Sequence, residues 1–126
     1  MRHLDPLADQ LIPGEDGMPS ASEAGATGPW LEAVLEARPD LRAPLEGLEA
    51  STAGLEPAEA IAVLPERDPA GWTALSSAVV AAYYFNPEVC ERIGYAGQRA
   101  IPLGPVDHED LLGSVVARGP VYRPTP

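Results

Sequence analysis

The chain is short of cysteine, lysine and aromatic residues. Its 126 residues include one cysteine, Cys90, which excludes an intrachain disulfide and a metal site built from several thiolates. No CxxCH motif is present, which excludes covalently attached c-type haem. All eight basic residues are arginine, so the chain also lacks the side chain that forms Schiff bases with carbonyl substrates.

Positive charge is scarce as well. The net charge is -11, and residues 1–68 hold 14 acidic and 4 basic side chains, whereas residues 69–126 hold 5 and 4. Phosphate binding needs clustered cations, so this composition argues against a nucleic acid as partner. The negative charge belongs almost entirely to the first half of the chain.

Targeting and membrane signals are not found in the sequence. Its first residues, Met-Arg-His-Leu-Asp, show neither a charged region followed by an apolar run nor a twin arginine. The longest uncharged apolar stretch is about 15 residues, which is too short to span a bilayer. We therefore expect a soluble chain without membrane insertion, cytoplasmic as given and periplasmic if a signal has been trimmed.

Apolar residues make up 45% of the chain, and 15 prolines and 12 glycines are spread among them. This composition predicts one globular domain of short elements with frequent connections. The strongest element is an uncharged helix over residues 69–85, capped by Asp68 and opened by Pro69. Its apolar residues surround the helix, so we expect neighbouring elements to cover it on nearly every side.

Shorter helices are predicted around this central one. They cover residues 5–12, 29–38, the segment that follows an Asp40 cap, 57–64 with Pro65 closing it, 87–93 ending at Gly94, and 107–118 ending at Gly119. A capping box is predicted at residues 20–23. The fold class is all-α, with about seven short helices over residues 1–119. Residues 120–126 contain three prolines and are expected to form an extended tail.

Candidate catalytic residues are few. Cys90 is expected on the inner face of its helix with Val89 and Ile93, as a buried and inert thiol. His108 stands among acidic residues where a helix N-terminus is predicted, which is ordinary capping. Metal ligation by His108 with Glu109 or Asp110 is the alternative, although adjacent residues diverge on a helix. We predict no catalytic, cofactor-binding or metal site in this chain.

Aromatic residues are concentrated in the second half. The consecutive residues Tyr83, Tyr84 and Phe85 cannot all pack inward, and Tyr95 lies between two glycines. Tyrosine, tryptophan and arginine are the usual anchors of protein interfaces. The predicted partner-binding residues are Trp72, Tyr83, Tyr84, Tyr95, Tyr122 and Arg123. The alternative is that the aromatic rings only close a small core.

Two stretches resemble the gluconate 2-dehydrogenase subunit 3 family. Residues 7–13 read LADQLIP and residues 19–26 read PSASEAGA, which is similar to the family's opening. Residues 82–89 read AYYFNPEV and residues 93–97 read IGYAG, which is similar to its second patch. Ser20 departs from the glycine that the family favours there, and the twin-arginine signal of many members is absent.

The resemblance implies a role as a small accessory subunit. Members of that family are partners of FAD-containing large subunits of the glucose–methanol–choline type, which oxidise sugars or polyols. It implies a hetero-oligomer with FAD in the partner and no catalytic residue in this chain. The alternatives from other classes are a free-standing helical adaptor, a transient folding chaperone, and an enzyme that uses His108.

Overall fold

The computed structural model describes residues 1–98, 100 and 107–120, and all regular structure in these residues is helical. The chain divides into two units, residues 1–96 and 97–126, which are described separately. The predicted all-α class is confirmed. The predicted boundary between a helical domain (1–119) and an extended tail (120–126) stays a prediction. Residues 121–126 of that tail lie outside the described residues.

The first unit contains six α-helices and two short 3-10 helices in its described residues. In chain order they are η1 (Arg2–Leu4), α1 (Asp5–Leu11), α2 (Pro29–Ala37), η2 (Pro39–Leu41), α3 (Arg42–Ser51), α4 (Pro57–Arg67), α5 (Pro69–Phe85) and α6 (Pro87–Arg92). The second unit contains α7 (Asp107–Arg118), with the left-handed Gly119 after it. The helices therefore begin at the prolines or aspartates that the sequence predicts, apart from α3.

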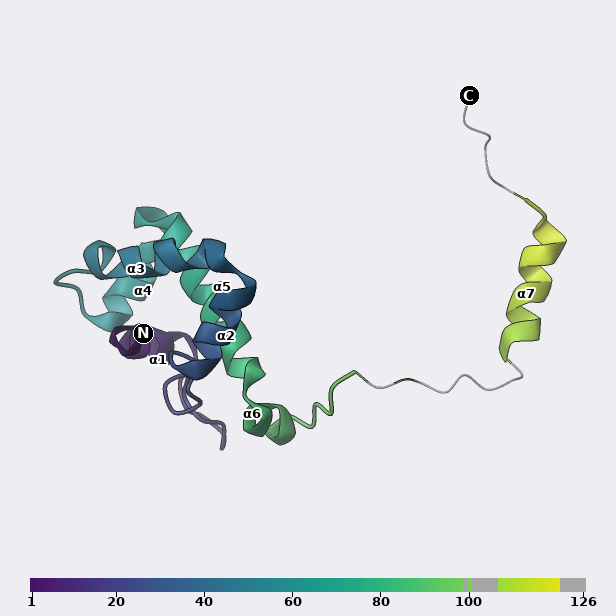
Figure 1. Ribbon diagram of the computed structural model, residues 1–126, viewed down its shortest axis with the longest axis horizontal. Coiled ribbons are helices and arrows are strands. Elements are labelled where there is room, and N and C mark those ends of the chain that lie inside the picture. The colour runs from purple at the N-terminus through teal and green to yellow at the C-terminus, as the bar shows by residue number, and fades with distance from the viewer. Residues whose placement is uncertain (99, 101–106, 121–126) are drawn as a thin grey trace, which may run out of the picture. The chain divides into compact units, whose positions relative to one another are not determined.

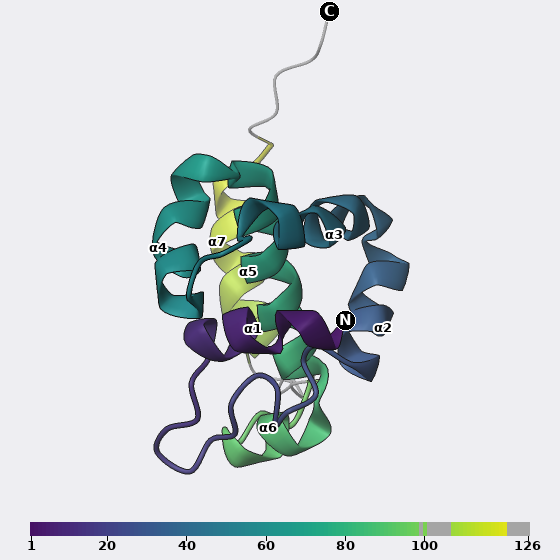
Figure 2. The same cartoon turned by 90° about the vertical axis from the view of Figure 1, so that its left-hand side faces the viewer.

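The first unit is organised around α5. Figures 1 and 2 show α1 to α4 gathered around this helix and α6 continuing from its C-terminal end, and α5 contacts each of them. Its inner face buries Leu75 and Val79 completely, together with three alanines. Leucines from the surrounding helices close the core, namely Leu31, Leu35, Leu45, Leu48 and Leu64. The predicted central helix is thus confirmed.

Side chains that the sequence singles out cap the first turns of α5 and α6. The Asp68 carboxylate accepts a hydrogen bond from the Gly71 amide at 2.9 Å and another from the Ser51 hydroxyl at 2.7 Å. Asn86 follows the last residue of α5, and its side chain caps α6 by accepting a hydrogen bond from the Glu88 amide at 2.8 Å. The Asn86 amide nitrogen also donates to the Ala24 carbonyl at 3.0 Å, which ties the α5–α6 corner to the long loop.

The long loop spans residues 12–28 and contains no helix. Polar contacts hold it in place. The predicted capping box forms, since the Ser20 amide donates to the Glu23 carboxylate at 2.9 Å, but the residues after it make turns. Asp9 on α1 accepts from both the amide and the hydroxyl of Ser22, at 2.8 and 2.7 Å. Partial burial opposes ionisation of Asp9, yet these hydrogen bonds outweigh it and lower its pKa.

The end of α4 and the start of α3 differ from those predicted. Helix α4 continues through Pro65 to Arg67, because the Asp68 amide still donates to the Leu64 carbonyl at 2.9 Å and closes the last turn. Asp40 is not a helix cap. Its carboxylate accepts two hydrogen bonds from the Arg38 guanidinium, at 2.9 and 2.7 Å, and α3 begins only at Arg42, after η2.

Candidate partner-binding surface

Large apolar side chains are exposed at the C-terminal end of α5 and directly after α6. Tyr84, Phe85, Ile93 and Tyr95 each expose between 49% and 55% of their surface. These four residues are called the aromatic corner below. An exposed patch of large apolar residues is typical of an interaction site, whereas single exposed ones are not.

A helix C-terminus fixes Tyr95 in this position. Gly94 adopts a φ of 71°, which a residue with a side chain rarely adopts, and the chain reverses there. The Tyr95 amide then donates to the Cys90 carbonyl at 2.8 Å, five residues back, in the pattern of a Schellman motif. The predicted stop at Gly94 is therefore confirmed, and it directs Tyr95 away from the helix axis.

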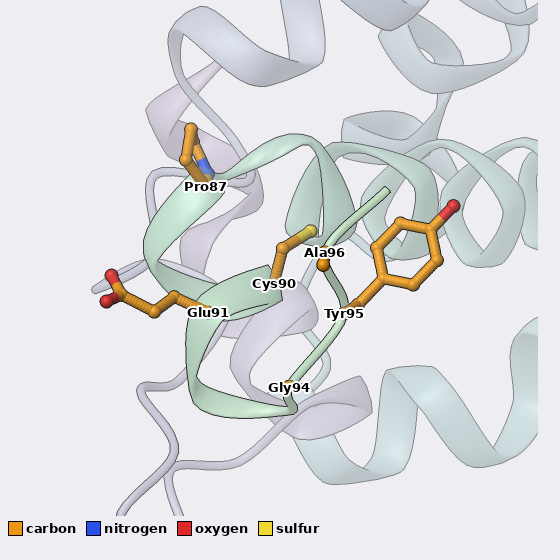
Figure 3. A pocket seen from close by; sticks show the side chains of 6 residues that line it. All are labelled: Pro87, Cys90, Glu91, Gly94, Tyr95 and Ala96. Carbon is orange, nitrogen blue, oxygen red and sulfur yellow. The ribbon is translucent and has the colours of Figure 1, made fainter. Parts of the chain in front are cut away.

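A hollow of about 410 Å³ lies beside Tyr95 and opens to solvent. Its lining residues are Pro87, Cys90, Glu91, Gly94, Tyr95 and Ala96, which are drawn in Figure 3. The Cys90 sulfur lies on the side of Ala96 and the Tyr95 ring, while the Glu91 carboxylate points the other way. The hollow thus offers a mostly apolar wall with one carboxylate at its edge.

The predicted partner-binding residues differ in how much of their surface is exposed. Tyr84 and Tyr95 are exposed, and Trp72 is half-buried against the core. Tyr83 corrects the prediction, because its side chain is only 4% exposed and its hydroxyl donates to the Pro19 carbonyl at 2.9 Å. Burial raises the pKa of Tyr83. This tyrosine holds the long loop to α5 and is not available to a partner.

The other two predicted anchors, Tyr122 and Arg123, lie outside the described residues. Their role in docking stays a prediction.

Helix α6 corrects two further expectations. Only Val89 is fully buried, whereas Ile93 is half exposed and Cys90 is partly exposed. The Cys90 thiol donates a hydrogen bond to the Tyr84 carbonyl at 3.1 Å. Helix α6 buries so little because it has only six residues, so little more than one turn can face the core.

Val80 and Phe85 are exposed as well, although neither is among the predicted partner-binding residues. Val80 is exposed although it belongs to the most apolar helix, and it lies one turn before Tyr84 on the same face. A signal was present, since Leu75, Val79 and Ala82 define the inner face and Val80 falls outside it. Helix α5 is therefore not covered on nearly every side within the first unit, which corrects that prediction.

Catalytic chemistry finds little support elsewhere in the described residues. Among them, no group of three or more histidine, cysteine or acidic side chains could hold a metal ion. His3 is exposed, and the side chain of His108 in the first turn of α7 is not described. A second hollow of about 350 Å³ is lined by Asp5, Ser22, Glu23 and Thr27, among others. Its polar groups are already engaged, because the Thr27 hydroxyl donates to Asp5 and Ser22 bonds to Asp9.

Comparison with known protein families, with curated proteins and with solved structures finds no match for this chain. The resemblance to the gluconate 2-dehydrogenase subunit 3 family therefore stays a prediction. Within the described residues, none of the helices combines the length and apolar character that crossing a membrane requires.

Proposed function

We propose that this chain is a non-catalytic accessory subunit that binds and stabilises a larger protein partner. The observation that carries the proposal is the aromatic corner, whose four large side chains are half exposed and uncharged on a chain of net charge -11. Burying such side chains in a partner removes apolar area from water at about 25 cal/mol per Å². Tyrosine and phenylalanine also lose few rotamers when they dock.

The proposed partner is the FAD-containing large subunit of a sugar or polyol oxidoreductase. This identity rests on the two stretches that resemble the gluconate 2-dehydrogenase subunit 3 family. The second stretch, residues 82–97, includes the aromatic corner, so a segment that carries the resemblance also has large apolar side chains that are half exposed. FAD and the catalytic residues would belong to the partner.

Affinity capture with the tagged full chain tests the proposal. The captured complex is separated by size exclusion, and the partner is identified by its flavin absorbance and its mass. A partner without flavin contradicts the proposed identity and favours a general helical adaptor. A flavoprotein that binds only during its folding, and is absent from the mature peak, favours a transient chaperone.

Substitutions in the aromatic corner test the surface itself. Tyr84→Asp should weaken binding about 10-fold, the effect of losing one interface anchor. The control is Ala43→Asp, which adds the same charge to an exposed position on α3, the helix that contacts α5 near Gly71. If both variants bind like the unmodified chain, the aromatic corner is not the docking surface.

The tail provides an independent arm of the test. Tyr122 and Arg123 are proposed to dock through a proline-stiffened segment, which loses less entropy on binding than a flexible one. Deleting residues 119–126 should reduce the yield of the co-purified complex. An unchanged yield would show that the tail is not an anchor, without bearing on the aromatic corner.

A further inference from the structure

One face of α5 remains open along most of the helix. Thr73, Ser77, Val80 and Tyr84 are all exposed and follow one another at spacings of four, three and four residues, so they form one continuous ridge. These four residues are called the α5 ridge below. It leads into the aromatic corner at Tyr84 and extends the uncharged surface back to the first turns of the helix.

The absence of charge on this ridge sets it apart from the exposed faces of α2 and α3. Helices α2 and α3 expose Glu32, Glu36, Glu46 and Glu49. No residue of α5 carries a charge, from Pro69 to Phe85. A solvated helix face normally carries charged residues opposite its apolar stripe, so an uncharged one is typical of a face that another element covers.

Two hydroxyl groups, one on the ridge and one beside it, are already hydrogen-bonded within α5. The Thr73 hydroxyl donates to the Pro69 carbonyl at 2.8 Å, and the neighbouring Ser76 hydroxyl donates to the Trp72 carbonyl at 2.8 Å. Covering a polar group is costly when its donor loses water without finding a new acceptor. Because the Thr73 and Ser76 donors have acceptors in their own helix, covering these two groups carries little such cost.

Charge decides which kind of partner fits. Each chain carries a net charge of -11, so a second copy on this face would bring two strongly acidic molecules together. After Tyr84 the chain turns at Asn86 into α6, where Glu88 and Glu91 are exposed and the exposed Arg92 donates to the Gly17 carbonyl. A partner segment with an uncharged stripe, and with arginine or lysine at the end facing α6, would complement both features.

We propose that an α-helix of the large partner subunit lies along the α5 ridge, with basic residues at its end next to Glu88 and Glu91. A helix is the element that matches, because a single straight ridge packs into the groove between the ridges of another helix at about 8–10 Å between axes. This inference rests on the proposed function for the identity of the partner. The kind of element recognised is argued from the ridge alone.

Site-specific cross-linking tests the inference on the full chain in its captured complex. A photoreactive amino acid is placed at 73, 77, 80 or 84, one position at a time, with position 43 on α3 as the control. The cross-linked partner residues should move by three or four positions for each step along α5. Arginine or lysine should lie near the residues reached from position 84, and position 43 should give no partner product.

Three outcomes overturn the inference. The first is cross-links that advance by two residues, as along a strand, or that scatter over loops. The second is products confined to this chain or to a second copy of it. The third is no product from any ridge position. A partner without flavin that shows the helical spacing would instead refute the proposed function and leave the helix-docking inference standing.

A pair of substitutions at Ser77 gives a second readout. Ser77→Glu places a charge on the ridge and should weaken binding at least about 10-fold. Ser77→Ala keeps the face uncharged and should bind within about twofold of the unmodified chain, since we assign the hydroxyl no role toward the partner. Equal affinity of Ser77→Glu and the matched Ala43→Glu control would contradict the inference. A Ser77→Ala variant that loses binding would contradict it as well.

Discussion

Gly71 and Gly47 lie in neighbouring helices of the first unit but have opposite surroundings. A Cβ atom at Gly71 would meet the Asp68 carboxylate and would lie 2.7 Å from Leu48 Cδ2. A Cβ atom at Gly47, on the exposed side of α3, would meet nothing within 4 Å. Neither glycine has a positive φ, so the two differ in space and not in backbone conformation.

This contrast yields a matched pair of predictions. Gly47→Ala should raise the free energy of unfolding by about 0.5–1 kcal/mol, the usual gain of alanine over glycine within a helix. Gly71→Ala should lower it by about 1–3 kcal/mol, because the added methyl group displaces the cap or Leu48. Urea unfolding followed by circular dichroism measures both. If both variants are stabilised, the close contact around Gly71 does not exist.

At the scale of elements, α5 depends on the cap at its first turn. Asp68 joins three helices, since it precedes α5, follows α4 and accepts from Ser51 on α3. The hydrogen bond from the Gly71 amide, followed by that from Ser51, lowers the pKa of the Asp68 carboxyl. The charged form is thus favoured in the folded state, where it also faces the positive end of the α5 dipole.

The sign of the pH effect follows from this lowered pKa. A carboxyl whose folded pKa is below its unfolded value of about 3.9 stabilises the fold above that value. The contribution is lost as the pH falls through the folded pKa. We therefore expect Asp68→Asn to be less stable than the unmodified chain by about 0.3–1 kcal/mol at pH 7. That difference should shrink toward zero as the pH falls below about 3.9.

Urea unfolding over this pH range measures the difference between the two proteins. Glu49→Gln, at an exposed position of α3, controls for the loss of one negative charge. A difference between Asp68→Asn and the unmodified chain that stays constant with pH would show that the cap does not depend on ionisation.

At the scale of the whole molecule, the buried core is confined to one unit. Every core residue identified in the described part of the chain lies between Leu4 and Val89. Helix α7 instead exposes Leu112, Val115 and Val116 along one stripe. A helix of 12 residues is marginal in water without such a stripe being covered. The stability of the first unit should therefore not depend on residues beyond 96.

A fragment of residues 1–96 tests this separation. It should fold cooperatively, with a thermal midpoint within about 5 °C of that of the full chain, the shift that roughly 1 kcal/mol causes in a domain of this size. Calorimetry measures both midpoints, and near-ultraviolet circular dichroism checks the packing of Tyr83. A fragment that fails to fold would show that residues 97–126 complete the core.

Several features of this protein could be predicted from its residues in order. The all-α class, the helix over residues 69–85, the caps at Asp68 and Asn86 and the stop at Gly94 depend on contacts within a few residues of the chain. Capping hydrogen bonds and the 3.6-residue period of a helix depend on residues that are close together in the sequence.

Other features were decided only by tertiary packing. Tyr83 and Tyr84 are adjacent and chemically identical, yet only Tyr83 is buried. The Pro19 carbonyl, 64 residues away in the chain, accepts a hydrogen bond from the Tyr83 hydroxyl. Val80 is exposed and Val79 is buried because α2, α3 and α4 cover only one side of α5. Periodicity identifies an apolar helix, but the number and placement of its neighbours decide which apolar residues remain for a partner.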